Sequence, residues 1–153
     1  MVDEALHANM RNRSLLLAAL ITLSSLSVVI ANDTVTTQDV DLSGNHTMTG
    51  NYTVSHGTTL TIKPGTTIDM QNYWMEVEGT LIANNATIMS SIQTTGLGSH
   101  NAGVWDALTI TSIGSATLDN VTISNAKSCM IIDGTLTAKS LVIEDCLIGI
   151  EVD

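Results

Sequence analysis

The chain has 153 residues, which is enough for one domain, and 44% of them are apolar, so the composition excludes a disordered protein. The formal net charge is −10 with only 5 lysine and arginine residues, so the basic patch that nucleic acids and anionic membrane surfaces require is absent. Phenylalanine is missing and Thr, Ser, Asn, Ile and Val are abundant, which favours strands and turns over helices.

The chain begins with a segment typical of protein export. Arg11 and Arg13 precede an apolar run over residues 15–30. Val29 and Ala31 are small or modest in size at the −3 and −1 positions, which favours cleavage after Ala31. We therefore expect residues 1–31 to be a signal peptide and the mature protein to be secreted or held at the cell surface. The alternative is an uncleaved membrane anchor, the only contact with a membrane that we expect, although the run is shorter than the roughly 20 apolar residues of a span.

A polar stretch over residues 32–50 follows and is expected to form a lead-in and N-terminal cap. From residue 51 to residue 153 apolar residues alternate with polar ones in short runs, which predicts strands with one buried face. Gly- and Pro-containing turns separate these runs. The alternating pairs are Leu60 and Ile62, Met75 and Val77, Leu108 and Ile110, Val121 and Ile123, and Met130 and Ile132.

The chain also repeats itself. Residues 79–88 recur as residues 134–143, and residues 121–126 align with residues 141–146 at a shift of 20. The interval from Ile88 to Ile123 is 35, which we interpret as one period plus an insertion near residues 90–104. A unit of about 20 residues cannot bury its apolar face alone, so the repeat predicts about four to five stacked coils in a parallel β-solenoid.

Several motifs resemble those of secreted right-handed parallel β-helix repeat proteins. Residues 57–68 and 77–83 resemble the opening coils of that family, and Gly103-Val104-Trp105-Asp106-Ala107-Leu108 resembles its Gly-x-Trp-x-Gly-Ile coil start, with Ala107 in place of glycine. Residues 143–150 resemble the Ile-x-Asn-Cys-x-x-Gly-Ile repeat, with Asp145 in place of asparagine. The resemblance implies an all-β, right-handed parallel β-helix, a fold that carries lyases, hydrolases, adhesins and inert stalks alike.

Further expectations follow from the repeat. Cys129 and Cys146 are one coil and three residues apart in this register, which places them beyond the Cα separation of about 7 Å that a disulfide tolerates, so we expect two buried free thiols. Asp153 falls inside a coil, so we expect the sequence to be the N-terminal part of a longer protein. The open strand edge there would also allow self-association.

Candidate sites for sugars are of two kinds. N-x-Ser/Thr sequons predict glycosylation at Asn45, Asn51, Asn85 and Asn120, although such sequons also arise by chance in a chain rich in Asn and Thr. The aromatic side chains of Tyr73, Trp74 and Trp105 are candidates for stacking on a polysaccharide or a cell-envelope component. For Trp105 the alternative is packing at the start of a coil.

A metal site and a catalytic site have weaker support. Asp133, Glu151 and Asp153 gather near one turn and suggest calcium, against the alternative of a solvated acidic face, and no other cofactor is expected. No catalytic signature is present, so we do not expect this segment to be an enzyme. The sequence favours a structural or adhesive surface scaffold. The alternative is the N-terminal part of a carbohydrate-active β-helix enzyme, a polysaccharide lyase or hydrolase, with catalytic coils beyond residue 153.

Overall fold

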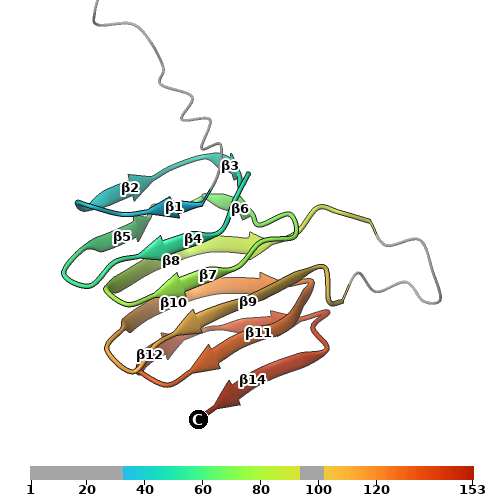
Figure 1. Cartoon of the computed structure of the whole chain (residues 1–153). Helices are drawn as coiled ribbons and strands as arrows, with labels where there is room; N and C mark the ends of the chain where they lie inside the picture. The colour runs from blue at the N-terminus through green and yellow to red at the C-terminus, as the bar shows by residue number, and fades with distance from the viewer. Residues whose placement is uncertain (1–32, 94–101) are drawn as a thin grey trace, which may run out of the picture.

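The computed structural model describes residues 33–93 and 102–153, and every regular element within these ranges is a β-strand. The strands pair in parallel and stack as a β-solenoid of about 5 turns, which confirms the predicted fold class (Figure 1). The right-handed sense stays a prediction. The expected signal segment and residues 94–101 of the insertion lie outside the described residues. Among the described residues, no helix is long and apolar enough to cross a bilayer.

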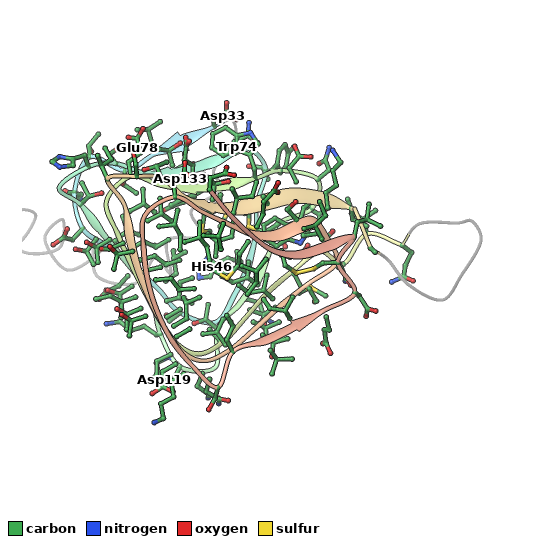
Figure 2. The ribbon with its side chains drawn as sticks, turned by 90° about the horizontal axis from the view of Figure 1, so that it is seen from below. Asp33, His46, Trp74, Glu78, Asp119 and Asp133 are labelled. Carbon is green, nitrogen blue, oxygen red and sulfur yellow. A yellow bond between two sulfur atoms is a disulfide. The ribbon has the colours of Figure 1, made fainter. Side chains whose placement is uncertain are left out.

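Each coil contributes strands to three faces, which we number 1 to 3. Together they give the solenoid a triangular outline in Figure 2. Face 3 is a six-stranded sheet in the order β1-β4-β7-β9-β11-β14. Its strands are β1 (Thr34–Val35), β4 (Tyr52–Val54), β7 (Met75–Val77), β9 (Trp105–Ile110), β11 (Ala126–Ile132) and β14 (Ile148–Val152).

Faces 1 and 2 are the two halves of an eight-stranded sheet that bends along a corner. The long strands β8 and β10 cross this corner at Asn85 and Asn120, which have positive φ angles of 48° and 54°. Asparagine tolerates this left-handed conformation better than other residues with a side chain, so the corner falls where asparagine recurs. The strands are β2 (Val40–Leu42), β5 (Thr59–Ile62) and β12 (Thr135–Lys139) on face 1, β3 (Asn45–Thr47), β6 (Thr67–Asp69) and β13 (Val142–Glu144) on face 2, and β8 (Thr80–Met89) and β10 (Ser115–Ser124) on both.

The strand register follows the predicted repeat. Ile88 pairs with Ile68 on one side and with Ile123 on the other, and Ile123 pairs with Ile143. The 20-residue period is therefore confirmed, and so is the longer interval of 35 from Ile88 to Ile123, across which the register is kept. Every pairing brings like positions of successive coils together.

The interior consists of columns of apolar side chains, one residue from each coil. On face 1, for example, Leu60, Leu81 and Ala116 lie on top of one another, with exposed fractions of 0%, 0% and 2%. Burial of apolar surface contributes about 25 cal/mol per Å², and a single coil has no second layer against which to bury its own face. The stacking of coils is therefore the main source of stability.

The third corner, between faces 3 and 1, holds a column of glycines. A Cβ atom on Gly79, Gly114 or Gly134 would collide with a backbone carbonyl oxygen of the preceding coil. The chain can make this close passage only without a side chain, which explains why glycine returns once in each of these coils. The glycines that we interpreted as turn markers thus also set how closely the coils stack.

Residues 32–50, which we expected to be a polar lead-in and cap, contain three strands. Thr34 in β1 pairs with Tyr52, Val40 in β2 with Leu60, and His46 in β3 with Ile68. This polar stretch therefore forms the first of the coils that the structure describes.

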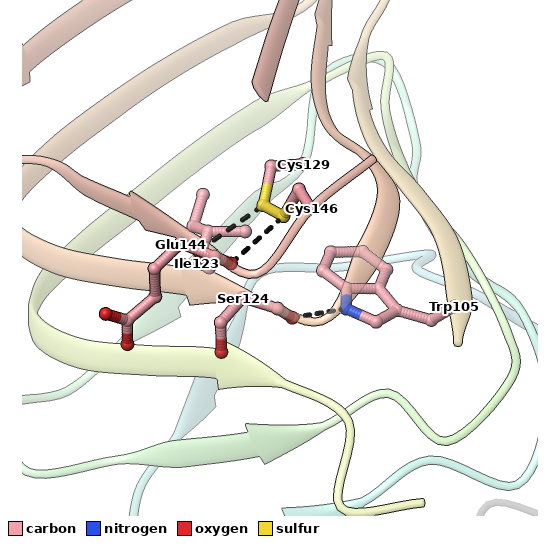
Figure 3. Close-up of a disulfide and its surroundings, with 6 residues drawn as sticks. All are labelled: Trp105, Ile123, Ser124, Cys129, Glu144 and Cys146. Carbon is pink, nitrogen blue, oxygen red and sulfur yellow. Dashed lines mark hydrogen bonds between the residues drawn. A yellow bond between two sulfur atoms is a disulfide. The ribbon is translucent and has the colours of Figure 1, made fainter. Parts of the chain in front are cut away.

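The expectation of two free thiols is wrong. Cys129 and Cys146 form a disulfide with their Cα atoms 5.7 Å apart (Figure 3). Two local features shorten the separation that we expected. The chain turns at Asp145, whose φ is 53°, so the residues after it do not continue in the direction of β13. Cys129 lies at an irregularity of β11, where the register to β9 shifts between Ser128 and Met130, and its side chain is fully buried.

Removal of the disulfide should destabilise the last two coils. Cys129 and Cys146 are 17 residues apart, and closing a loop of this size stabilises the folded state by about 3 kcal/mol in the chain-entropy model. Addition of a reductant should therefore lower the Tm of the wild-type protein, measured by circular dichroism. The matched control is the Cys129→Ala/Cys146→Ala double variant, whose Tm should be lower from the start and unaffected by reductant. A wild-type Tm that reductant leaves unchanged would contradict the prediction.

Candidate functional site

The clearest candidate site is a corner formed by Asp33, Asn51 and Trp74. These residues precede Thr34, Tyr52 and Met75, which pair in register, so they lie at the same place in three successive coils. The Asn51 amide N–H donates to Oδ1 of Asp33 at 2.9 Å, and the Trp74 amide N–H donates to Oδ1 of Asn51 at 3.3 Å. In Figure 2, which views the stack along its length, Asp33 and Trp74 project onto the same side of the triangle.

This corner offers the groups that carbohydrate contact requires. Trp74 is partly exposed, the Asn51 carboxamide accepts a hydrogen bond from its backbone amide, and the Asp33 carboxylate lies one coil further on. A flat aromatic ring packs on the apolar face of a sugar, while neighbouring polar groups bind its hydroxyls. Tyr73 is also half-buried and packs against the core, and its carbonyl oxygen accepts a hydrogen bond from the Asp106 amide at 3.2 Å. The structure thus brings together Asn51 and Trp74, which the sequence suggested for separate reasons.

Trp105 has a different role. Its side chain is 0% exposed, and its Nε1–H donates to the carbonyl oxygen of Ser124 at 2.8 Å (Figure 3). The indole fills the interior where β9 begins, close to the disulfide of the neighbouring coils. Its ring face is therefore not available to a sugar at the surface, and the packing alternative describes this residue.

The sequon asparagines differ in accessibility. Asn45 is exposed on β3, and Thr47 of the same sequon is exposed as well. Asn51 is half-buried within the corner described above. Asn85 and Asn120 are exposed, but Nδ2 of Asn120 donates to Oδ1 of Asn85 at 2.8 Å, so the two carboxamides form a ladder across adjacent coils. Glycosylation stays a prediction at all four positions.

The acidic residues suggested for calcium gain no support from the geometry. Asp133 and Asp153 follow the paired residues Ile132 and Val152, so they occupy equivalent positions in adjacent coils. Glu151 accepts a hydrogen bond from Ser128 Oγ at 3.5 Å. Within residues 33–93 and 102–153, no three His, Cys, Asp or Glu side chains form a group that could hold a metal ion.

A cavity of about 720 Å³ lies at the first coil and was not predicted from the sequence. Val40, Leu42, Met48 and Tyr52 supply its apolar lining, and His46 projects into the triangle in Figure 2, with its Nε2 2.9 Å from the carbonyl oxygen of Ser43. Thr34 also lines the cavity, and its Oγ1 is buried without a hydrogen-bond partner. The sequence did contain a signal for this cavity. Thr34 and His46 are polar, but they stand at the positions that Tyr52 and Ile68 occupy in the next coil.

Asp69 links the turn that follows β6 to the residues that follow β8 in the next coil. Its carboxylate accepts hydrogen bonds from the amide and Oγ of Ser91, at 3.0 and 2.5 Å, and from the amide and Nε2 of Gln71, at 3.2 and 2.6 Å. Partial burial acts to raise the pKa of Asp69, but the hydrogen bonds from Ser91 and Gln71 together outweigh it and hold the pKa below the usual value of 3.8. The ionised carboxylate is therefore part of the folded turn.

Comparison of the chain with protein-family models, curated proteins and solved structures finds no match. The resemblance of its motifs to those of secreted β-helix proteins therefore has no support from an overall similarity. A parallel β-solenoid by itself does not indicate an activity, because unrelated functions share such folds. The residues of the described coils have to carry any functional argument.

The turn at Asp69 predicts how stability depends on pH. Because folding depresses this pKa, the carboxylate contributes its full stabilisation above pH 3.8 and loses it as the pH falls through the lower folded-state pKa. The Asp69→Asn variant should unfold more easily in urea at pH 7, by about 1 kcal/mol for the weakened hydrogen bonds, and the difference from wild type should shrink below pH 3.8.

Asp119→Asn is the matched control for this prediction. Asp119 forms an exposed ion pair with Lys139 at 3.8 Å, and such pairs contribute only about 0–1 kcal/mol. Its loss should therefore change the urea midpoint little at pH 7. Equal effects of the two substitutions would contradict the role assigned to Asp69.

Proposed function

We propose that the protein is an exported β-solenoid that serves as a structural or adhesive scaffold at the cell surface or outside the cell. The disulfide between Cys129 and Cys146 carries this proposal, because disulfides persist in oxidising compartments and are rare in a reducing cytosol. The export-like segment over residues 1–31 and the acidic composition, which favours solubility, are consistent with it.

The shape of the molecule suits a scaffold. Successive coils repeat the same register, so the stack is rigid across the strands and presents three outward faces. Adhesion is supported by the corner of Asp33, Asn51 and Trp74, where backbone amides hold the two polar side chains in place next to a partly exposed tryptophan. The partner that fits these groups is a polysaccharide or another sugar-bearing component of the cell envelope, and glycosylation at Asn45 would be compatible with this location.

The alternative is the N-terminal part of a carbohydrate-active β-helix enzyme with catalytic coils beyond residue 153. One observation favours a partner for the last coil. Ile148, Ile150 and Val152 are 48%, 47% and 72% exposed, although Ile150 and Val152 continue columns that are buried in the coils above. Further coils, or a second copy of the chain stacked on β14, would bury these side chains. A mass that does not change with concentration would argue against self-association.

Export is tested by expressing the full-length gene in a cell with a secretory pathway. The mature protein should be found outside the cytoplasm with its N-terminus at Asn32, and mass spectrometry without reduction should find Cys129 linked to Cys146. Protein that is retained in the cytosol with two alkylatable thiols would overturn the proposal. An intact N-terminus on membrane-bound protein with the disulfide would instead support the anchored form at the cell surface.

Adhesion through the corner predicts that Trp74→Ala weakens binding to polysaccharide. The substitution removes the partly exposed ring and leaves Asp33 and Asn51 in place, so retention on insoluble polysaccharides should fall by roughly 5- to 30-fold, the range expected for loss of one 1–2 kcal/mol contact. Thr109→Ala, an outward position of the same face on β9, is the control and should bind as wild type does. Wild-type retention by the Trp74 variant would remove the corner from the binding surface.

A further inference from the structure

The outward side of face 1 carries an ordered array of hydroxyl-bearing side chains. One column consists of Thr59, Thr80, Ser115 and Thr135, and the second, two residues further along each strand, consists of Thr61, Ile82, Thr117 and Thr137. These positions alternate with buried residues such as Leu81 and Leu118, so they point outward. We call these eight positions the hydroxyl array, in which Ile82 is the one residue without a hydroxyl.

The array has two fixed repeats. Neighbouring parallel strands are about 4.8 Å apart, and residues i and i+2 of one strand are about 6.6 Å apart on the same face. The in-register pairing of the strands imposes the first repeat on both columns, and the 3.4 Å contact between Ser115 Oγ and Thr80 Oγ1 shows that the side chains stack accordingly. Threonine is branched at Cβ and has few side-chain conformations, so its methyl and hydroxyl groups are held nearly fixed.

The array is free of charge, although the chain is strongly acidic. Charged groups border it on the same face. Asp41 continues the second column in the first coil and pairs with Lys63 at 2.9 Å. Asp119 and Lys139 lie two residues beyond Thr117 and Thr137 and pair at 3.8 Å. On the other two faces, charged residues interrupt the outward columns themselves, with Glu76 and Glu151 on face 3 and Asp69 and Glu144 on face 2. In Figure 2 face 1 is the side of the triangle between Asp133 and Asp119.

Threonine suits the exposed side of any sheet, and stacked threonine pairs stabilise strands. That explanation accounts for one column, and face 2 has such a column in Thr67, Thr87 and Thr122. It does not account for two adjacent columns without a charged residue over four successive coils, since charged side chains on an exposed sheet face favour solubility and hinder aggregation. Selection for a flat, uncharged and regular surface explains this arrangement directly.

Such a surface matches a ligand that is itself a lattice. Regular hydroxyls bind water, and the methyl groups between them confine it, so the bound water adopts the two repeats of the array. These repeats are close to those between oxygen atoms on the surface of ordinary ice. The array has no charge for an ionic ligand, and its side chains include no aromatic ring for a sugar. We propose that face 1 binds ice, a function beyond the scaffold role and independent of the corner at Trp74.

The test is partition of the purified, disulfide-bonded protein into ice. Ice is grown slowly from a solution that also contains a reference protein without affinity for ice, and the protein content of the ice and the liquid is compared. The wild-type protein should be enriched in the ice relative to the reference. Thr117→Lys and, separately, Thr137→Lys place a long charged side chain on exposed positions of the array, and each should reduce the enrichment to the reference level.

Thr122→Lys is the matched control, because it makes the same change on the same strand as Thr117 but on face 2. It should partition as wild type does, and thermal melting should confirm that all three variants fold. Exclusion of the wild-type protein from ice would overturn the proposal. Undiminished enrichment of both array variants, or equal loss in Thr122→Lys, would also overturn it. Binding of wild type to crystalline polysaccharide that is lost in the Thr117 and Thr137 variants, without enrichment in ice, would assign face 1 to that polymer instead.

Discussion

The whole structure depends on the burial of one coil against the next. A coil of this chain is a thin triangle of short strands, and its inward side chains meet partners mainly above and below. Each interior column, such as Leu60, Leu81 and Ala116, is therefore both the core and the contact that fixes the register. A slip by one residue would turn every inward side chain outward, so the register is strongly specified wherever the interior is apolar.

The corners solve the geometric problem that this stacking creates. Strands on three faces require the chain to turn sharply at the same height in each coil. At one corner the turn uses left-handed backbone at Asn85 and Asn120, whose carboxamides bond to each other. At another it uses glycines that leave room for the carbonyl oxygens of the preceding coil. The interior and the corners therefore place different demands on the sequence, one on apolar character and the other on backbone conformation.

The residues that the sequence predicted well are those governed by the period. Ile68, Ile88, Ile123 and Ile143 fall on one another because alternation and repeat length determine both their direction and their height. The disulfide was missed because a separation counted along a straight strand does not hold across the corner at Asp145 or at the irregularity of β11. The corner of Asp33, Asn51 and Trp74 and the cavity near His46 were missed for a related reason. Both depend on which side chains of successive coils come together, and a pattern of apolar residues does not describe the polar ones.

The disulfide has a consequence for how the protein withstands damage. Cys129 lies in β11 and Cys146 follows β13, so the closed loop contains β12 and β13. The outward side chains of these strands are exposed, and inward ones such as Leu136 and Ile143 are only partly buried. A protease that cuts the chain once within this loop produces two pieces that the sulfur bridge still joins. The C-terminal piece stays tethered beside its position on β11, where it can pair again without a search through solution. The last described coil can thus be cleaved once and still remain attached, which would be useful for the exported protein that we propose.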